Sequence, residues 1–340
     1  MRLPNLSALA GTAIVVSMFV AAPAHAWDSY GHRLIARLAL EGMSKRLGGD
    51  APAWLNDKDM TGAIVDNATT PDRWRSVKVA QLTHLNNPDH YIDAEELADF
   101  GMTLETMPRL RHEFVRQLEI AREKPDFKGP PINDKLDPSH VREYPGTLPF
   151  ATCETYAKVV SAMQVYRIID KLNDPGRRAQ LEGAKAAITF NMGVLAHYVG
   201  DGAQPLHTTI HHHGWVGENP NGYTTDRKFH AWIDGGVVKL HNITIADVRS
   251  VCAWHDKADA NEPWEDVIAH IKRSFDEVEP LYKLEKSGAL KKAPGKEFII
   301  SRLADGADML SALYADAWKA AEPTEKDVQD FVRYDNWQPE

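Results

Sequence analysis

The amino-acid sequence predicts an all-α protein with a single domain and long loops. Several segments carry apolar residues at helical intervals, and we find no convincing run of the alternation typical of strands. Candidate ligand residues lie on both sides of the one proline-rich stretch, which favours an insertion over a linker between domains. With 43% hydrophobic residues, the chain can bury a substantial core.

Residues 1–26 have the parts of a secretory signal peptide. A positive charge at Arg2 precedes an uncharged apolar stretch, and Ala26 ends a small-x-small cleavage site. Cleavage there would leave a domain of residues 27–340 that begins with Trp27. The alternative is an uncleaved anchor helix. We expect a periplasmic or secreted protein without a membrane anchor, because no later segment is apolar enough to span a bilayer.

After the signal peptide, six segments have helical periodicity. They are residues 32–46, 154–172, 181–200, 229–240, 265–278 and 298–318. Residues 215–223 are interrupted by glycines and a proline, and a short hairpin is possible there. Six prolines fall within residues 125–149, which predicts a long irregular insertion between helices.

Charge and cysteine content narrow the class of protein. The formal net charge of −9 argues against a nucleic-acid binder that relies on a basic patch. Cys153 and Cys252 are the only cysteines, so an exported protein could form one disulfide or keep two free thiols.

Two His/Asp pairs at helical spacing are the main chemical signal. His197 precedes Asp201 by four residues, His230 precedes Asp234 by four, and His207 lies between the pairs. Residues i and i+4 share one face of a helix, so each pair can direct an imidazole and a carboxylate at one point. This ligand set suits catalytic zinc. The alternative is a core histidine, but a buried carboxylate beside it needs a cation or several donors.

Spacing alone is a weak signal, because His255 and Asp259 repeat it in a charged segment that we interpret as surface. The order of several motifs along the chain says more. These are Trp-Asp-Ser-Tyr-Gly-His at residues 27–32, Pro-Asp-Arg-Trp-Arg at 71–75, His-Tyr-Ile-Asp at 90–93, and the segments 197–207 and 230–234.

Together these motifs resemble the S1/P1 nucleases, which are secreted trinuclear-zinc phosphodiesterases related in fold to bacterial zinc phospholipase C. The resemblance covers residues 27 to about 240 and implies that multi-helix fold. It also implies three zinc sites. One zinc would take Asp72, His90, His197 and Asp201. A close neighbour would share Asp201 and take His32 with the amino nitrogen and carbonyl oxygen of Trp27. The third would take His207, His230 and Asp234.

The same resemblance implies the catalytic and substrate-binding residues. Asp72 and Arg75 would be catalytic, with the arginine fork on phosphate oxygens. Tyr91 and Asp93 would stack on and hydrogen-bond a base. The alternatives are a surface arginine, a core tyrosine and an aspartate that caps the next helix.

We assign no catalytic role to the other histidines. The run of residues 211–213 is interpreted as a solvated rim, and His84 is a rival ligand that the His90 motif displaces. The gap between His90 and His197 is longer than is usual for the family, and the proline-rich insertion accounts for much of it. Residues 217–222 only loosely match the family's substrate loop.

We therefore expect a zinc-dependent enzyme that cleaves single-stranded DNA or RNA to 5′-phosphorylated products, with no stable protein partner. The first alternative is a zinc phospholipase C, although that family usually has glutamate where this chain has Asp234. The second is a non-catalytic periplasmic zinc-binding protein.

Overall fold

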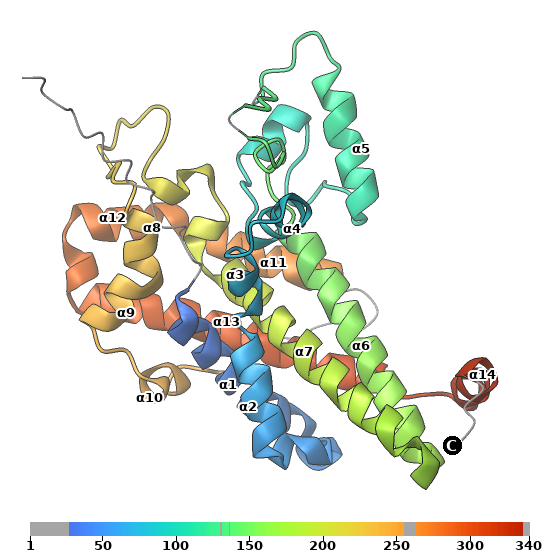
Figure 1. The fold of residues 1–340 in the computed structure, drawn as a ribbon. Coiled ribbons are helices and arrows are strands. Elements are labelled where there is room, and N and C mark those ends of the chain that lie inside the picture. The colour runs from blue at the N-terminus through green and yellow to red at the C-terminus, as the bar shows by residue number, and fades with distance from the viewer. Residues whose placement is uncertain (1–26, 130, 136, 255–262, 336–340) are drawn as a thin grey trace, which may run out of the picture.

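A computed structural model describes residues 27–129, 131–135, 137–254 and 263–335 (Figure 1). Within these ranges the chain consists of helices and connecting loops, with one isolated antiparallel bridge between Ile92 and Gly146. The all-α prediction is confirmed. None of the described helices has both the length and the apolar character that a membrane span requires. The predicted signal peptide and the His255/Asp259 pair lie outside the described residues.

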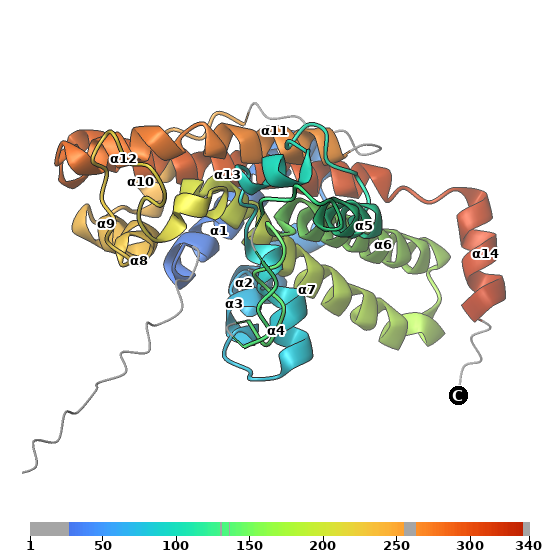
Figure 2. The ribbon, with the colours of Figure 1, turned by 90° about the horizontal axis from the view of Figure 1, so that it is seen from above.

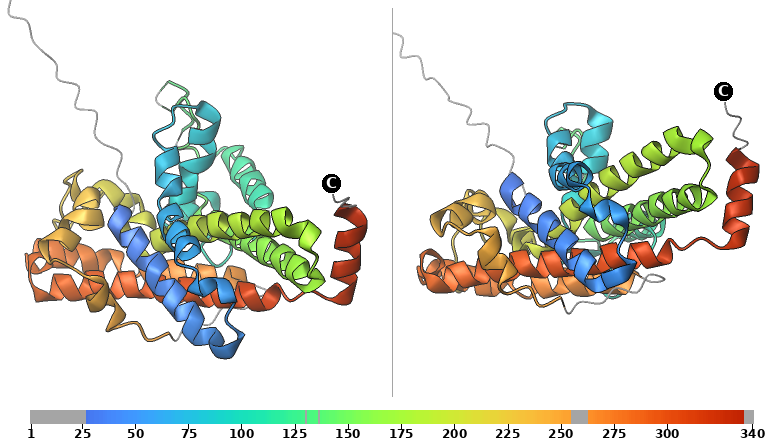
Figure 3. Two further views of the ribbon diagram at one scale, coloured as in Figure 1. Left: turned by 60° about the horizontal axis from the view of Figure 1, so that its bottom comes forward. Right: turned by 90° about the horizontal axis from the view of Figure 1, so that it is seen from below.

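The core is built around two long helices near the two ends of the described chain, α1 (Ser29–Leu47) and α13 (Ala293–Ala320). They pack against each other, as Figure 3 shows. Arg46 Nε donates to Ser311 Oγ at 2.7 Å across this contact. The N-terminal segment is therefore held by the C-terminal part of the chain.

The other two long helices, α6 (Leu148–Leu172) and α7 (Arg178–Ala203), form an adjacent pair (Figure 1). Helix α7 also contacts α1, α13 and α2 (Lys58–Asn67). Its C-terminal half is almost wholly buried, and this is the half that carries the first predicted His/Asp pair. That pair is therefore placed at the centre of the molecule.

Shorter elements close the molecule around the end of α7. Between α2 and α6 these are α3 (Thr70–Trp74), α4 (Ala80–Asn86), η3 (Pro88–His90), η4 (Glu96–Phe100) and α5 (Arg111–Arg122). After α7 they are η6 (Pro205–His207), η7 (Ile210–His213), α8 (Phe229–Ala231), η8 (Trp232–Gly236), α9 (Val237–Leu240), α10 (Ile245–Arg249), α11 (Pro263–Phe275), α12 (Val278–Lys286) and η9 (Ala289–Lys291). Helix α14 (Glu325–Asp335) stands apart from the body in Figure 2. The remaining short elements are η1 (Gly48–Asp50), η2 (Ala53–Asn56) and η5 (Pro175–Arg177).

Three details differ from the sequence-based expectations. The helix expected over residues 265–278 forms as α11 but ends at Phe275, and a separate helix, α12, begins at Val278. No strand forms in residues 215–223, so the possible hairpin is absent. The disulfide that two cysteines allowed is also absent, because Cys153 in α6 and Cys252 after α10 are not bonded.

Candidate metal centre

Five of the predicted ligands converge where α1, α3, η3 and α7 meet. Two groups of potential ligand atoms lie there, and within each group all atoms are within 4.8 Å of one another. The first consists of His32, His197 and Asp201, and the second of Asp72, His90 and His197. Since His197 belongs to both groups, they are adjacent.

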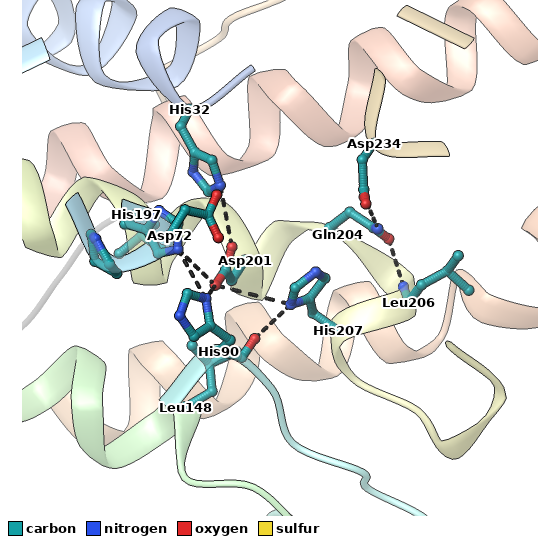
Figure 4. Close-up of polar contacts among 12 residues, drawn as sticks. His32, Asp72, His90, Leu148, His197, Asp201, Gln204, Leu206, His207 and Asp234 are labelled. Atoms are coloured by element: carbon teal, nitrogen blue, oxygen red, sulfur yellow. Dashed lines mark hydrogen bonds and ion pairs between the residues drawn. The ribbon is translucent and has the colours of Figure 1, made fainter. Parts of the chain in front are cut away.

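The Asp201 carboxylate lies at the middle of this cluster (Figure 4). Its Oδ2 is 3.0 Å from His90 Nδ1, 3.4 Å from His197 Nε2 and 3.9 Å from His207 Nδ1. Its Oδ1 is 3.4 Å from His32 Nε2. Three imidazoles, from α1, η3 and α7, thus lie within 3.4 Å of one carboxylate, which is a placement suited to a bridging ligand.

The third group consists of His207, His230 and Asp234, as the second His/Asp pair predicted. The two imidazoles face each other with Nε2 atoms 3.0 Å apart, and His230 Nε2 is 3.5 Å from Asp234 Oδ2. Asp234 lies in η8, a π-helical turn. Such turns are rare and are often found at functional sites.

Backbone carbonyls orient two of the histidines. His197 Nδ1 donates to Ala68 O at 2.9 Å, and His207 Nδ1 donates to His90 O at 2.6 Å. Each bond leaves Nε2 as the nitrogen that faces the ligand cluster. Histidines that bind metals are usually held in this way.

Close packing at Gly200 in α7 brings α1 against the site. A Cβ at this position would lie 2.9 Å from His32 Nδ1, closer than side chains normally approach. Glycine therefore permits the contact that brings the α1 histidine to the α7 carboxylate.

Burial makes this cluster unfavourable without a cation. Desolvation raises the pKa of Asp201 and of Asp234 well above the ordinary range and lowers the pKa of His207 to about 3. Asp201 Oδ1 and Asp234 Oδ2 are buried and accept no hydrogen bond from any residue that the structure describes. A divalent cation in each group would offset the cost of burying the carboxylates and would bind their unpaired oxygens, so the residues present fit a metal centre.

The ligand types narrow the metal. All three groups offer imidazole nitrogen and carboxylate oxygen, and none offers a thiolate. Such sets suit zinc in catalytic rather than closed structural sites. A fourth group, consisting of Asp134, His140 and Glu143, lies apart in the proline-rich insertion and is more exposed.

Trp27 lies directly before α1 and is fully buried. The amide of the next residue, Asp28, donates to Asp234 O at 3.2 Å, and the Asp28 side chain caps α1. The first residue of the predicted mature chain is thus held between α1 and the third ligand group. Its role as a zinc ligand stays a prediction.

A cleft of about 700 Å³ opens over the ligand groups and is lined by His90, His207 and His230. Arg75, Tyr91 and Asp93 line it as well, so all three predicted phosphate- and base-contacting residues face the same space. The Arg75 side chain is 19% exposed and its Nη1 lies 3.7 Å from Asp72 Oδ1. It is therefore not an ordinary surface arginine.

Of the alternatives for the two base-contacting candidates, the helix cap by Asp93 does not form, because Glu95 is the N-cap of η4. Tyr91 is only partly buried, and its hydroxyl donates to Val141 O at 3.5 Å. The Asp93 Oδ1 lies 3.6 Å from His212 Nδ1. Both residues line the cleft, and their contact with a base stays a prediction.

The histidine run of residues 211–213 is not a solvated rim, contrary to expectation. His211 is buried and stacks on Trp215 with ring centroids 3.8 Å apart. His212 and His213 line the cleft, and the His213 ring centroid is 5.4 Å from that of His230. The position of this run four to six residues after the predicted ligand His207 was the available signal. The rival ligand His84 lies on α4 outside all ligand groups.

Sequence reasoning also missed Gln204, the residue before η6. Its Nε2 donates to Asp234 Oδ1 at 2.7 Å, and its Oε1 accepts from Leu206 N at 2.6 Å (Figure 4). The side chain thereby fixes the direction of the Asp234 carboxylate. The sequence signal for this role was the position of a polar residue between the predicted ligands Asp201 and His207.

Gln204→Met should weaken zinc binding at the third group by about 10- to 100-fold, because it removes the bond that orients Asp234 while keeping the side-chain length. Zinc titration with a competing chromophoric chelator would measure this. Gln117→Met, on the exposed face of α5, is the matched control. Unaltered zinc affinity in the Gln204 variant would contradict the positioning role.

Comparison with protein-family models, curated proteins and solved structures finds no match for this chain. The resemblance to the S1/P1 nucleases thus rests on the sequence motifs. Function must be argued from the site itself.

Proposed function

We propose that this chain is an exported zinc-dependent phosphodiesterase that hydrolyses single-stranded DNA or RNA to 5′-phosphorylated products. One observation carries the proposal. Three buried His/Asp groups lie next to a cleft that His90, His207 and His230 line, and the same cleft is lined by an arginine, an aromatic side chain and a carboxylate. This arrangement combines metal ligands with groups suited to a phosphate and to a base.

The residues would hold three zinc ions. Bound zinc supplies Lewis-acid activation of the phosphodiester and of an attacking water. The chain's own part is to fix the ligands, as Ala68 O and His90 O do for two imidazoles, and to exclude bulk water from the floor. Asp72 joins the metal ligands to the phosphate-binding wall through its contact with Arg75.

Arg75 is the residue that we assign to the phosphoryl group. Its planar fork can donate two parallel hydrogen bonds to the oxygens of one phosphate. Its proximity to Asp72 holds it at the edge of the ligand cluster. Binding there would orient the scissile phosphate and balance charge that develops on its oxygens during cleavage.

Arg75→Ala should lower kcat/KM on single-stranded DNA by on the order of 10²-fold, as expected for loss of a donor to the reacting group. The kcat/KM of Arg75→Lys should lie between those of the wild type and Arg75→Ala, because lysine keeps the positive charge but lacks the planar fork of arginine. Arg73→Ala is the matched control, since Arg73 lies two residues away and pairs with exposed Asp66. Equal rates for both alanine variants would contradict the assignment.

The preference for single strands rests on Tyr91 and Asp93. Stacking on an aromatic ring tolerates many bases but requires a base that is free of its duplex. Asp93 would accept a hydrogen bond from an amino or imino group of that base. These roles follow from the family resemblance and are supported by the position of both residues on the cleft wall.

A substrate panel tests the proposal. The mature protein, with zinc content verified by mass spectrometry, would be offered single-stranded DNA, RNA, duplex DNA and phosphatidylcholine. We expect hydrolysis of both single strands, slower cleavage of the duplex and no release of the lipid headgroup. Lipid hydrolysis alone would identify a phospholipase C, and no turnover at full zinc occupancy would favour a zinc-binding protein.

A further inference from the structure

The proline-rich insertion, residues 125–149, folds back onto the cleft, where Val141, Arg142 and Tyr144 line the wall. Its end is fixed to the segment that carries His90 and Tyr91. Asp93 N donates to Pro145 O at 2.6 Å, and Leu148 N donates to Tyr91 O at 3.1 Å.

Gly146 makes this contact possible. Its φ of +95° is a conformation that glycine adopts readily, and a Cβ there would lie 2.1 Å from Tyr91 O. The position of Arg142 over the cleft is thus set by backbone contacts with the ligand-bearing segment.

A second arginine, Arg227, lines the same cleft from the segment before α8. Arg142 and Arg227 are both exposed. Neither guanidinium forms an ion pair or hydrogen bond with any part of the chain that the structure describes. Two cations without a protein counter-ion among the described residues therefore line the same cleft as Arg75.

Electrostatic effects on His213 agree with this placement. The pKa of His213 is lowered to about 4, chiefly by burial, and the positive charges of His212, Arg227, Arg75 and Arg142 contribute to this shift. All three guanidinium groups are thus close enough to act on a single side chain of the cleft. This local positive charge contrasts with the net charge of −9 for the whole chain.

The acidic side chains of the cleft lie together on one side of it. They are Asp93, which is 3.6 Å from His212, and Glu96, whose pKa is raised to about 7 chiefly by burial. Tyr91, Tyr144 and Trp215 supply aromatic rings among the arginines. Arginines interleaved with aromatic side chains are typical of surfaces that bind single strands.

We propose that Arg142 and Arg227 bind phosphates that neighbour the one held by Arg75, so that the cleft recognises up to three phosphates of a single-stranded nucleic acid. This inference rests on the proposed function and deepens it. The insertion supplies one of the two flanking contacts. It would make the enzyme favour oligonucleotides over substrates with a single phosphodiester.

The test compares Arg142→Ala, Arg227→Ala and the double variant, all zinc-loaded, on thymidylyl-thymidine and on a ten-residue oligothymidylate. Each single substitution should lower kcat/KM about 10-fold more on the oligonucleotide than on the dinucleotide. It should also reduce the slope of log kcat/KM against log salt concentration by about 0.7 per lost contact. Arg116→Ala, on the exposed face of α5, is the matched control.

Equal losses on the two substrates, or no loss, would overturn the proposal. Fluorescence anisotropy with a labelled oligothymidylate separates this inference from the proposed function. If the wild-type protein cleaves neither substrate, the proposed function fails, and the inference survives only if the double variant binds the strand at least 10-fold more weakly. If the double variant binds phosphatidylcholine vesicles more weakly than the wild type but binds the single strand equally well, the arginines contact a lipid surface and the proposal is overturned.

Discussion

Asp201→Asn should abolish most of the activity, lowering kcat/KM by on the order of 10³-fold. The carboxylate lies within 3.4 Å of His32, His90 and His197, so it is close to both adjacent ligand groups. An amide has the same shape but no charge, so it binds zinc poorly. Loss of even one catalytic metal removes several kcal/mol of transition-state stabilisation, which corresponds to a rate loss of this size.

The same variant should bind fewer than three zinc ions after dialysis, measured by mass spectrometry against protein concentration. Thermal unfolding in a chelator should show a fold as stable as the wild type without metal, because the asparagine is isosteric. Asp66→Asn, on the exposed end of α2, controls for the loss of an acidic residue. Three bound zinc ions with an unchanged rate in Asp201→Asn would contradict the bridging role.

Local helical geometry explains why the two His/Asp pairs could be predicted from sequence. Residues at i and i+4 share a face, and the pairs meet at 3.4 Å between His197 and Asp201 and at 3.5 Å between His230 and Asp234. The second pair remains close although the chain changes from α8 into a π-helical turn between them. Spacing does not reveal such a turn.

Asp72 and His90 could be placed only through the family resemblance. They lie on α3 and η3, which are too short to show a periodic pattern. Their positions depend on contacts between distant segments, such as the bond from His207 Nδ1 to His90 O. Arg142 and Arg227 could not be predicted as cleft residues for the same reason, because no local sequence pattern shows that the insertion folds over the cleft.

Helix ends were predicted less accurately than helix cores. Helix α6 begins at Leu148, six residues before the predicted start. Pro149 lies in the first turn of this helix, where a backbone N–H would have no intrahelical acceptor, so proline is tolerated there. In a sequence rich in prolines, Pro149 looks like part of the irregular insertion. Helix α11 ends at Phe275, and α12 begins at Val278 with Pro280 in its first turn, where proline is tolerated.

Retention of Ala26 before Trp27 should remove one of the three zinc ions and lower kcat/KM by on the order of 10²-fold. The resemblance implies that the Trp27 amino nitrogen is a ligand of the zinc proposed for His32 and Asp201. A free α-amino group has a pKa near 8, so a metal can displace its proton, whereas an amide nitrogen has no available lone pair. The fold is compatible with this, because Trp27 is buried one turn before His32 and its neighbour Asp28 is bonded to Asp234 O.

Two controls separate the amino group from the indole ring. Trp27→Phe with a free N-terminus should keep three zinc ions, because it changes only the buried side chain. Removal of the extra alanine by an aminopeptidase, verified by intact mass, should restore both the third zinc and the rate. An extended protein that holds three zinc ions and turns over at the wild-type rate would show that the amino group is not a ligand. Activity would then not depend on where the signal peptide is cleaved.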